Sequence, residues 1–263
     1  MAIEEFEVDG LVIREVKTGE ADKILTVLTG KYGKLTVSAK GTVSLRSRFA
    51  SSAQIFTYST FMLRKKGNFN YIKDTVFLEA FEGIRYDVEK LALANYICDV
   101  AEDLAQEGME DEELLSLVLN TLYALANRDL PVELVKGAFE FRAAVQEGFM
   151  PDLSGCGVCG CEPEGDSSLD VMNGRIVCKK CRTIVEYTPD YFLDDSQSKI
   201  MIRLSPSVLA ALRYIEQSTA KKFLSFRLDK QELPLFAVVC ERYLLNHLEH
   251  GFTSLEYYKK IKI

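Results

Sequence analysis

Four cysteines are the residues of this sequence best suited to chemistry. They stand as two Cys-x-x-Cys pairs, Cys156 with Cys159 and Cys178 with Cys181, separated by eighteen residues. Two residues between cysteines let a tight turn direct both sulfurs at one ion, and two such pairs at this separation are typical of a four-thiolate zinc site. Because four thiolates complete a tetrahedron, the spacing predicts one structural Zn²⁺ per chain rather than a catalytic ion.

The segment between the two pairs predicts how the second pair returns to the first. Residues 169–177 have the pattern of a β-hairpin in which Asn173 and Gly174 form a two-residue type I′ turn. Disulfides and a redox motif are the other interpretations, but nothing marks the chain as secreted and no thioredoxin-like pattern surrounds either pair. Cys161 lies just outside the first pair, and the spacing favours Cys159 as the ligand.

Positive charge is concentrated near the N-terminus, although the whole chain has a formal net charge of −7. Residues 10–73 hold twelve Lys and Arg against three Asp and Glu, a net charge of +9, whereas residues 81–263 hold twenty against thirty. Such an asymmetry suggests that one part of the chain binds a polyanion. The charge alone does not say which polyanion, and the cations that we predict to contact it are Lys34, Lys40, Arg46, Arg48, Arg64, Lys65 and Lys66.

The elements that would position these cations are strands. Residues 1–80 contain about five β-prone runs, separated by turn signals at the spacing of a small barrel. We predict a five-stranded OB-fold β-barrel, and an SH3-like barrel with similar strand counts stays open as an alternative. An OB barrel offers aromatic platforms for bases and a positive groove for phosphates. The candidate aromatics, most of them expected in the core, are Tyr32, Phe49, Phe56, Tyr58, Phe61, Phe69 and Tyr71.

From Phe81 onward the apolar residues recur at helical spacing. Ser205 and Pro206 have the pattern of a helix cap and first turn, while the last long helix begins either at a capping box formed by residues 229–232 or near Pro234. The predicted fold class is therefore α+β and multidomain. An OB-fold DNA-binding domain spans residues 1–80, and an all-α domain spans 81–263 with an inserted four-cysteine zinc module at 154–184.

Composition excludes several classes of protein. No window approaches 18 consecutive apolar residues, so no membrane span is expected. The acidic N-terminus is unlike a signal peptide, and Cys98 and Cys240 fit buried free thiols, which together predict a cytoplasmic protein. No Gly-rich phosphate loop, paired catalytic carboxylates or Ser-His-Asp elements accompany the cysteines, so we do not predict an enzyme.

Three stretches of the sequence resemble the RecO family of DNA repair and recombination mediators. Residues 10–41 are similar to that family's opening barrel. The most specific match is Phe-Glu-Phe-Arg at residues 139–142, followed by residues 148–160 with the first two cysteines. Residues 243–248 and 254–256 are similar to the family's terminal helices. Some members of the family lack the zinc cysteines, whereas all four positions are filled here.

This resemblance implies a recombination mediator without a catalytic centre. Proteins of the family bind single- and double-stranded DNA, anneal complementary strands, and help load RecA onto strands coated by single-stranded DNA-binding protein. They act with RecR, bind the acidic, Phe-ended tail of the coating protein, and associate with the nucleoid during repair. For that tail we predict an apolar slot edged by three cations, Arg128, Lys136 and Arg142.

Two functions from other classes remain as alternatives. A zinc-ribbon scaffold that binds only proteins would have no salt-dependent affinity for DNA. A cysteine-based oxidoreductase that used Cys159 or Cys161 would have a reactive thiol of low pKa and no stable metal.

Overall fold

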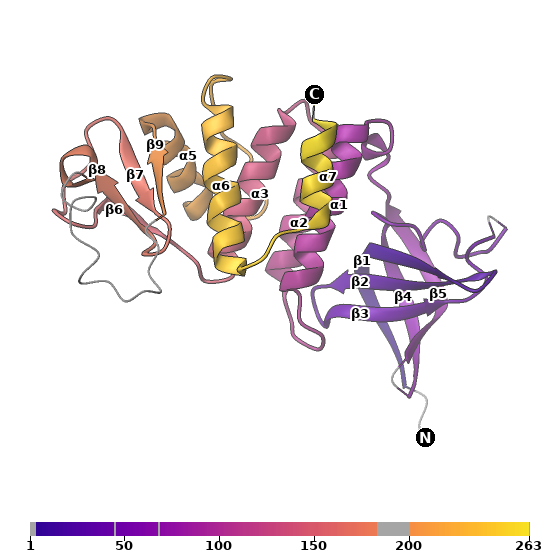
Figure 1. Cartoon of the computed structure of the whole chain (residues 1–263). Helices are drawn as coiled ribbons and strands as arrows, with labels where there is room; N and C mark the ends of the chain where they lie inside the picture. The colour runs from indigo at the N-terminus through magenta and orange to yellow at the C-terminus, as the bar shows by residue number, and fades with distance from the viewer. Residues whose placement is uncertain (1–3, 45, 68, 183–199, 263) are drawn as a thin grey trace. The chain divides into compact units, whose positions relative to one another are not determined.

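The computed structural model describes residues 4–44, 46–67, 69–182 and 200–262, which fold into two compact units (Figure 1). One unit comprises Met1–Val132 together with Phe252–Ile263, and the other comprises Glu133–Gly251. The predicted domain boundary after residue 80 falls inside the first unit, directly after the last strand of its barrel. As a boundary between independently folding domains it stays a prediction.

The first unit begins with a closed five-stranded barrel. Its strands are β1 (Glu4–Thr18), β2 (Asp22–Thr29), β3 (Gly33–Ala39), β4 (Tyr58–Lys66) and β5 (Phe69–Glu79). They follow each other around the barrel as β1-β2-β3-β5-β4, and every pair is antiparallel except β3 with β5. This Greek-key order confirms the OB-fold prediction over the SH3-like alternative.

Alternation of buried and less buried residues along β3 and over most of β2 explains why the barrel closes on an apolar interior. Leu25 and Val27 on β2 and Val37 on β3 are completely buried, and Phe61 of β4 packs in the same core. Successive side chains of a strand point to opposite faces, so every second residue of these strands is directed inward. Phe56, another candidate aromatic, is also buried and unavailable to a base.

Three helices complete the first unit, together with the short 3-10 turn η1 (Glu82–Ile84). They are α1 (Val88–Leu104), α2 (Glu112–Asn127) and α7 (Thr253–Ile261). Asp87 and Asp111 cap α1 and α2 by accepting hydrogen bonds from backbone N–H groups of the first turn. Helix α7 returns from the end of the chain to pack beside α1 (Figure 1).

The second unit combines helices with a small sheet. Its helices are α3 (Val132–Gln146), α5 (Pro206–Gln217) and α6 (Leu233–Leu248), and its strands are β6 (Asp152–Cys156), β7 (Ser167–Asp170), β8 (Arg175–Cys178) and β9 (Met201–Leu204). The sheet has the order β6-β8-β7-β9. Strand β9 was not predicted, and with β6 it extends the sheet beyond the predicted module of residues 154–184.

Helix starts in this unit follow local rules. Ser205 accepts a hydrogen bond from the N–H of Val208, which confirms the predicted cap of α5. Helix α6 begins with Leu233 and Pro234, and Glu232 at its N-cap makes no capping hydrogen bond. The capping-box interpretation is therefore wrong and the start near Pro234 is correct, because proline lacks an N–H and is tolerated in the first turn.

The predicted type I′ turn between the cysteine pairs is also wrong. Asp170 pairs with Arg175, so four residues connect β7 and β8. A type I′ turn needs positive φ at both central residues, and here Gly174 has φ +56° whereas Asn173 does not have positive φ. The carboxylate of Asp170 accepts hydrogen bonds from the backbone and side-chain N–H groups of Asn173, at 3.3 and 2.8 Å, and so closes the longer turn.

No helix within the described ranges is long and apolar enough to cross a membrane.

Candidate metal centre and nucleic-acid interface

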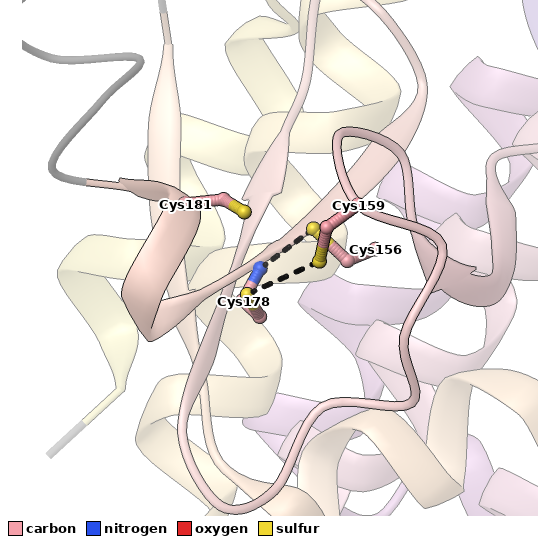
Figure 2. A group of neighbouring side chains, drawn as sticks. All are labelled: Cys156, Cys159, Cys178 and Cys181. Atoms are coloured by element: carbon pink, nitrogen blue, oxygen red, sulfur yellow. Dashed lines mark hydrogen bonds between the residues drawn. The ribbon is translucent and has the colours of Figure 1, made fainter.

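The four predicted cysteines meet at one point of the second unit (Figure 2). Their four Sγ atoms all lie within 4.8 Å of one another. Cys156 ends β6 and Cys178 ends β8, and these two strands pair side by side, which brings the two Cys-x-x-Cys segments together. Cys156, Cys178 and Cys181 are buried, while Cys159 is exposed. Four thiol groups at this separation fit one tetrahedral metal ion.

Hydrogen bonds to sulfur favour the thiolate form that a metal requires. Burial raises the pKa of Cys156, but backbone N–H groups of Cys178, Cys159 and Val158 outweigh it and lower that pKa to about 6. The pKa of Cys159 is also lowered, first by the thiol and then by the backbone N–H of Cys161. The pKa of Cys181, in contrast, is raised to about 12, first by its hydrogen bond to Cys159. Without an ion, the surroundings therefore favour the thiolate form at Cys156 and Cys159 but not at Cys181.

The cysteines do not form disulfides. All seven are free thiols, and Cys98 and Cys240 are buried in helices as predicted. Burial raises the pKa of both thiols well above the ordinary value, which makes them unreactive at neutral pH.

Exposed cations of the barrel gather around Tyr71, where β3 and β4 end and β5 begins. The Nζ atom of Lys40 lies 5.4 Å from the centre of the Tyr71 ring, and Arg64 stands opposite Tyr71 in the β4–β5 pair. Arg48, from the loop between β3 and β4, donates a hydrogen bond of 2.9 Å to the carbonyl of Lys73. We use the name basic rim for six exposed cations: Lys40, Arg48, Arg64, Lys65, Lys66 and Lys73.

Aromatic side chains accompany the basic rim. Phe69 is 52% exposed at the start of β5 and stands opposite Lys66. Tyr71 is half-buried, and Phe49 lies beneath the guanidinium of Arg48 with its ring centre 4.4 Å away. Of the three candidate aromatics beside cations of the rim, Phe69 and Tyr71 are the two that are not buried, since Phe49 is only 9% exposed.

Lys34 belongs to another part of the barrel, no described side-chain contact ties Arg46 to the basic rim, and one member of the rim was not predicted. Lys34 is half-buried and donates a hydrogen bond of 2.6 Å to the carbonyl of Glu102, at the end of α1. Arg46 is exposed in the loop between β3 and β4. Lys73 was not predicted, because its position inside a strand gave no sign that the fold would bring it beside Arg48. Its only sequence signal was its share of the +9 charge of residues 10–73.

A carboxylate partly neutralises the basic rim. Glu5 of β1 accepts hydrogen bonds from both Lys73 and Arg64. These bonds, with that of Lys73 contributing most, lower the pKa of Glu5. The carboxylate thus stays ionised at neutral pH and occupies two of the rim's cations.

The three cations of the predicted tail slot are not alike. Lys136 is only 3% exposed, and its ammonium lies 2.7 Å from Glu140 and 2.8 Å from Glu241. Arg142 donates to the carbonyl of Glu216, and Arg128 ends α2 in the other unit. The burial of Lys136 disagrees with its predicted place at the exposed edge of a slot, because its charge is already paired.

The fold and the sites together define an OB-barrel protein with a second unit that carries a four-cysteine module of a geometry that fits one metal ion. Two family models match this arrangement in order. The model for "Recombination protein O N terminal" covers residues 1–81, and that for "Recombination protein O C terminal" covers residues 85–191. The chain belongs to the RecO family of DNA repair proteins.

Relatives along nearly the whole chain agree with this assignment. The DNA repair protein RecO of Acetivibrio thermocellus is 30% identical over 96% of this chain and 95% of its own length. That of Alkaliphilus metalliredigens is 28% identical over 96% of this chain and 98% of its own length. The RecO protein of Desulforamulus reducens is 34% identical over 68% of this chain and 69% of its own length. These similarities assign the protein a role in DNA repair and recombination.

Proposed function

We propose that this RecO-family protein is a recombination mediator that binds single- and double-stranded DNA through the basic rim of its barrel. The observation that carries the proposal is the convergence of exposed cations from three elements around Tyr71. Cations gathered on one rim can neutralise several phosphates of a DNA strand. Such contacts do not read the bases. Phe69 and Tyr71 supply faces on which the bases of a single strand stack.

Annealing follows from the same surface, whereas loading of RecA rests on membership of the family. Two complementary strands repel each other through their phosphates, so a protein that neutralises both strands favours their pairing. By membership of the family, the protein assists RecA loading onto strands coated by single-stranded DNA-binding protein, with RecR and the tail of the coating protein as partners. Lys136, one of the three cations predicted to edge a slot for that tail, is buried and paired with Glu140 and Glu241.

The four-cysteine cluster holds one structural Zn²⁺ in this proposal. Cys156, Cys159, Cys178 and Cys181 are the ligands, and they leave no coordination position for water or substrate. Bound zinc would hold the two Cys-x-x-Cys segments together. The free energy of zinc binding would therefore stabilise the fold of this part of the chain. Metal analysis of the purified, reduced protein tests this assignment, and the absence of zinc from such a sample contradicts it.

The DNA assignment is tested by the salt dependence of binding to single-stranded DNA. Each phosphate contact adds about 0.7 to the slope of log affinity against log salt concentration. Replacing Arg48, Lys65 and Lys66 by glutamine should therefore lower that slope by roughly two units and weaken binding to all sequences equally. The control carries the same change of charge in the zinc module, at Lys179, Lys180 and Arg182. If the control loses more of the slope, the barrel is not the main DNA site.

Glu5 provides a test in the opposite direction. Glu5→Gln removes the carboxylate that occupies Arg64 and Lys73, so affinity for DNA should increase and the salt slope should steepen. Glu7→Gln is the matched control, because Glu7 lies two residues away on the same strand, opposite Met62 rather than a cation. Equal effects of the two variants would mean that only overall charge matters.

The same titrations decide between this function and the protein-only scaffold. A scaffold that binds proteins through its zinc module predicts no salt-dependent affinity of the native protein for DNA. A measurable slope for the native protein excludes it.

A further inference from the structure

A fifth thiol lies at the four-cysteine cluster. The Sγ atom of Cys161 is 3.0 Å from that of Cys159, and the Cys161 thiol also interacts with that of Cys178. Cys161 is therefore in contact with one ligand from each of the two Cys-x-x-Cys pairs, although its position in the sequence excludes it from both pairs.

The backbone holds Cys161 at this place. Gly160 has φ +74° and donates a hydrogen bond of 2.7 Å to the carbonyl of Cys156. The carbonyl of Cys161 accepts a hydrogen bond of 2.9 Å from the N–H of Cys156. These two hydrogen bonds turn the chain back onto Cys156. Cys161 is therefore part of the same turn as Cys156 and Cys159. The left-handed conformation that this turn needs is one that glycine adopts without steric cost.

Burial divides the ligands into two kinds. Cys156, Cys178 and Cys181 are buried and packed with Val177 in one apolar cluster, which fixes their positions. Cys159 is exposed, and so is its neighbour Cys161. Three corners of the tetrahedron are thus set by the core, and the fourth lies at the surface, where two thiols are available.

We propose that Cys159 and Cys161 are alternative ligands for this fourth corner. The inference rests on the proposed metal site and adds Cys161 as a second possible ligand at one of its four positions. In the exchange, the bond from the metal to Cys159 breaks and that sulfur takes a proton from water. Cys161 gives its proton to water and forms the new bond, so that charge and coordination number are unchanged. Zn²⁺ imposes no geometric preference from its d electrons, which allows one thiolate to replace another. The ion is then retained when the exposed Cys159 has been oxidised or alkylated.

Cobalt binding tests the exchange, because Co²⁺ in a four-thiolate site has a visible spectrum distinct from that of a three-thiolate site. The full-length, reduced, metal-stripped chain is titrated with Co²⁺ as the native protein and as single variants. We expect the four-thiolate spectrum, at one ion per chain, for Cys159→Ser and for Cys161→Ser alike. The matched control Cys156→Ser removes a ligand of the buried apolar cluster, to which the exposed Cys161 does not belong, so it should lose that spectrum. The double variant Cys159→Ser, Cys161→Ser should lose it too.

Two outcomes separate failure of the inference from failure of the metal site. If the native chain binds no Co²⁺, the metal site itself is absent. If the native chain gives the four-thiolate spectrum and Cys159→Ser behaves like Cys156→Ser, the site stands and Cys161 is not a ligand.

A second measurement needs no substitution and so does not depend on any variant folding. The native chain, loaded with one Zn²⁺, is briefly alkylated with iodoacetamide and the modified cysteines are located by mass spectrometry. Exchange at the fourth corner predicts label on both Cys159 and Cys161, in chains that each carry one label at this site. Label confined to Cys161 would mean that Cys159 never leaves the metal, and would overturn the inference.

Discussion

Lys136 and its two partners show how pairing changes the role of a charged residue. Burial alone lowers the pKa of Lys136, but the carboxylates of Glu140 and Glu241 outweigh it and raise that pKa. Glu140 is completely buried on the same helix, and Glu241 comes from α6. The ammonium therefore ties α3 to α6 as a charged group inside the second unit.

Removing this ammonium should be costly. Lys136→Met leaves two carboxylates close together in a buried place, and we expect a loss of about 3–5 kcal/mol in the free energy of unfolding. The triple variant Lys136→Met, Glu140→Gln, Glu241→Gln removes all three charges and should recover most of that loss. Urea denaturation followed by circular dichroism measures both. A Lys136→Met protein as stable as the native one would contradict the buried pairing.

His247 is a second residue whose surroundings set its chemistry. Its ring stacks on Phe149 with the centroids 4.6 Å apart and meets the edge of Tyr243 at 4.5 Å. Its buried Nε2 atom has no hydrogen-bond partner in the described part of the chain. Burial lowers the pKa of His247, because the charged ring would lose its hydration there.

Stability should consequently depend on pH through His247. The unfolded chain takes up the proton near pH 6.5, at a higher pH than the folded chain, so stability present above about pH 6.5 is lost as the pH falls. His247→Gln should reduce the difference between free energies of unfolding measured at pH 7.5 and pH 5.5. His250→Gln removes the chain's other histidine and is measured beside it as the comparison. A larger reduction in His250→Gln than in His247→Gln would contradict the assignment to His247.

At the scale of elements, the turn between β2 and β3 joins the barrel to the helices of its own unit. The carbonyl of Tyr32 accepts a hydrogen bond from the N–H of Gly108, and the carbonyl of Gly30 accepts one from that of Asp111. Gly33, with φ +60°, lies so close to the segment before α2 that a Cβ atom would overlap the carbonyl oxygen of Gln106. The turn can pack there only because this position has no side chain.

Alanine substitutions at two glycines with similar backbone conformations distinguish the cost of backbone strain from the cost of steric overlap. Gly33 and Gly41 both have positive φ, but a Cβ on Gly41 would meet nothing within 4 Å. Gly41→Ala should cost about 1–2 kcal/mol from the left-handed conformation alone. Gly33→Ala should cost roughly 1–3 kcal/mol more, because the turn must move away from Gln106. Thermal denaturation of the two variants measures the difference, and equal losses would mean that the turn relaxes freely.

At the scale of the whole molecule, the first unit is completed by the far end of the chain. Leu255 and Tyr258 of α7 are almost fully buried in it, and Phe252 packs edge-on against Tyr96 of α1 at 5.6 Å. The unit that contains the barrel therefore needs residues that follow the second unit in the sequence.

Substitutions of two adjacent tyrosines of α7 test whether this helix stabilises the first unit. Tyr258→Ala should destabilise the first unit by about 3–5 kcal/mol, because it leaves a cavity beside α1. Tyr257→Ala, at a position 59% exposed, should change stability by no more than about 0.5 kcal/mol. Metal content is measured in parallel and should be unchanged in both, because the cysteines belong to the other unit. Loss of metal in Tyr258→Ala would show that the two units do not respond separately.

Short-range patterns determined the parts of this protein that the sequence could predict. The cysteine spacing predicted which thiols cluster, because two Cys-x-x-Cys turns each form within four residues. The β-prone runs that became β2 and β3, the cap at Ser205 and the proline of α6 likewise depend on a few residues, and each prediction is confirmed. The hairpin between the cysteines was also predicted, and only its turn type was wrong.

Contacts between distant residues were decided by the tertiary structure alone. Lys34 and Lys136 looked like available cations, but their partners Glu102 and Glu241 lie 68 and 105 residues away in the sequence. The same packing brought Lys73 beside Arg48, placed β9 next to β7, and returned α7 to α1. A charge becomes a binding group or an internal ion pair according to which segments pack around it, and that depends on the burial of apolar surface over the whole fold rather than on any local pattern.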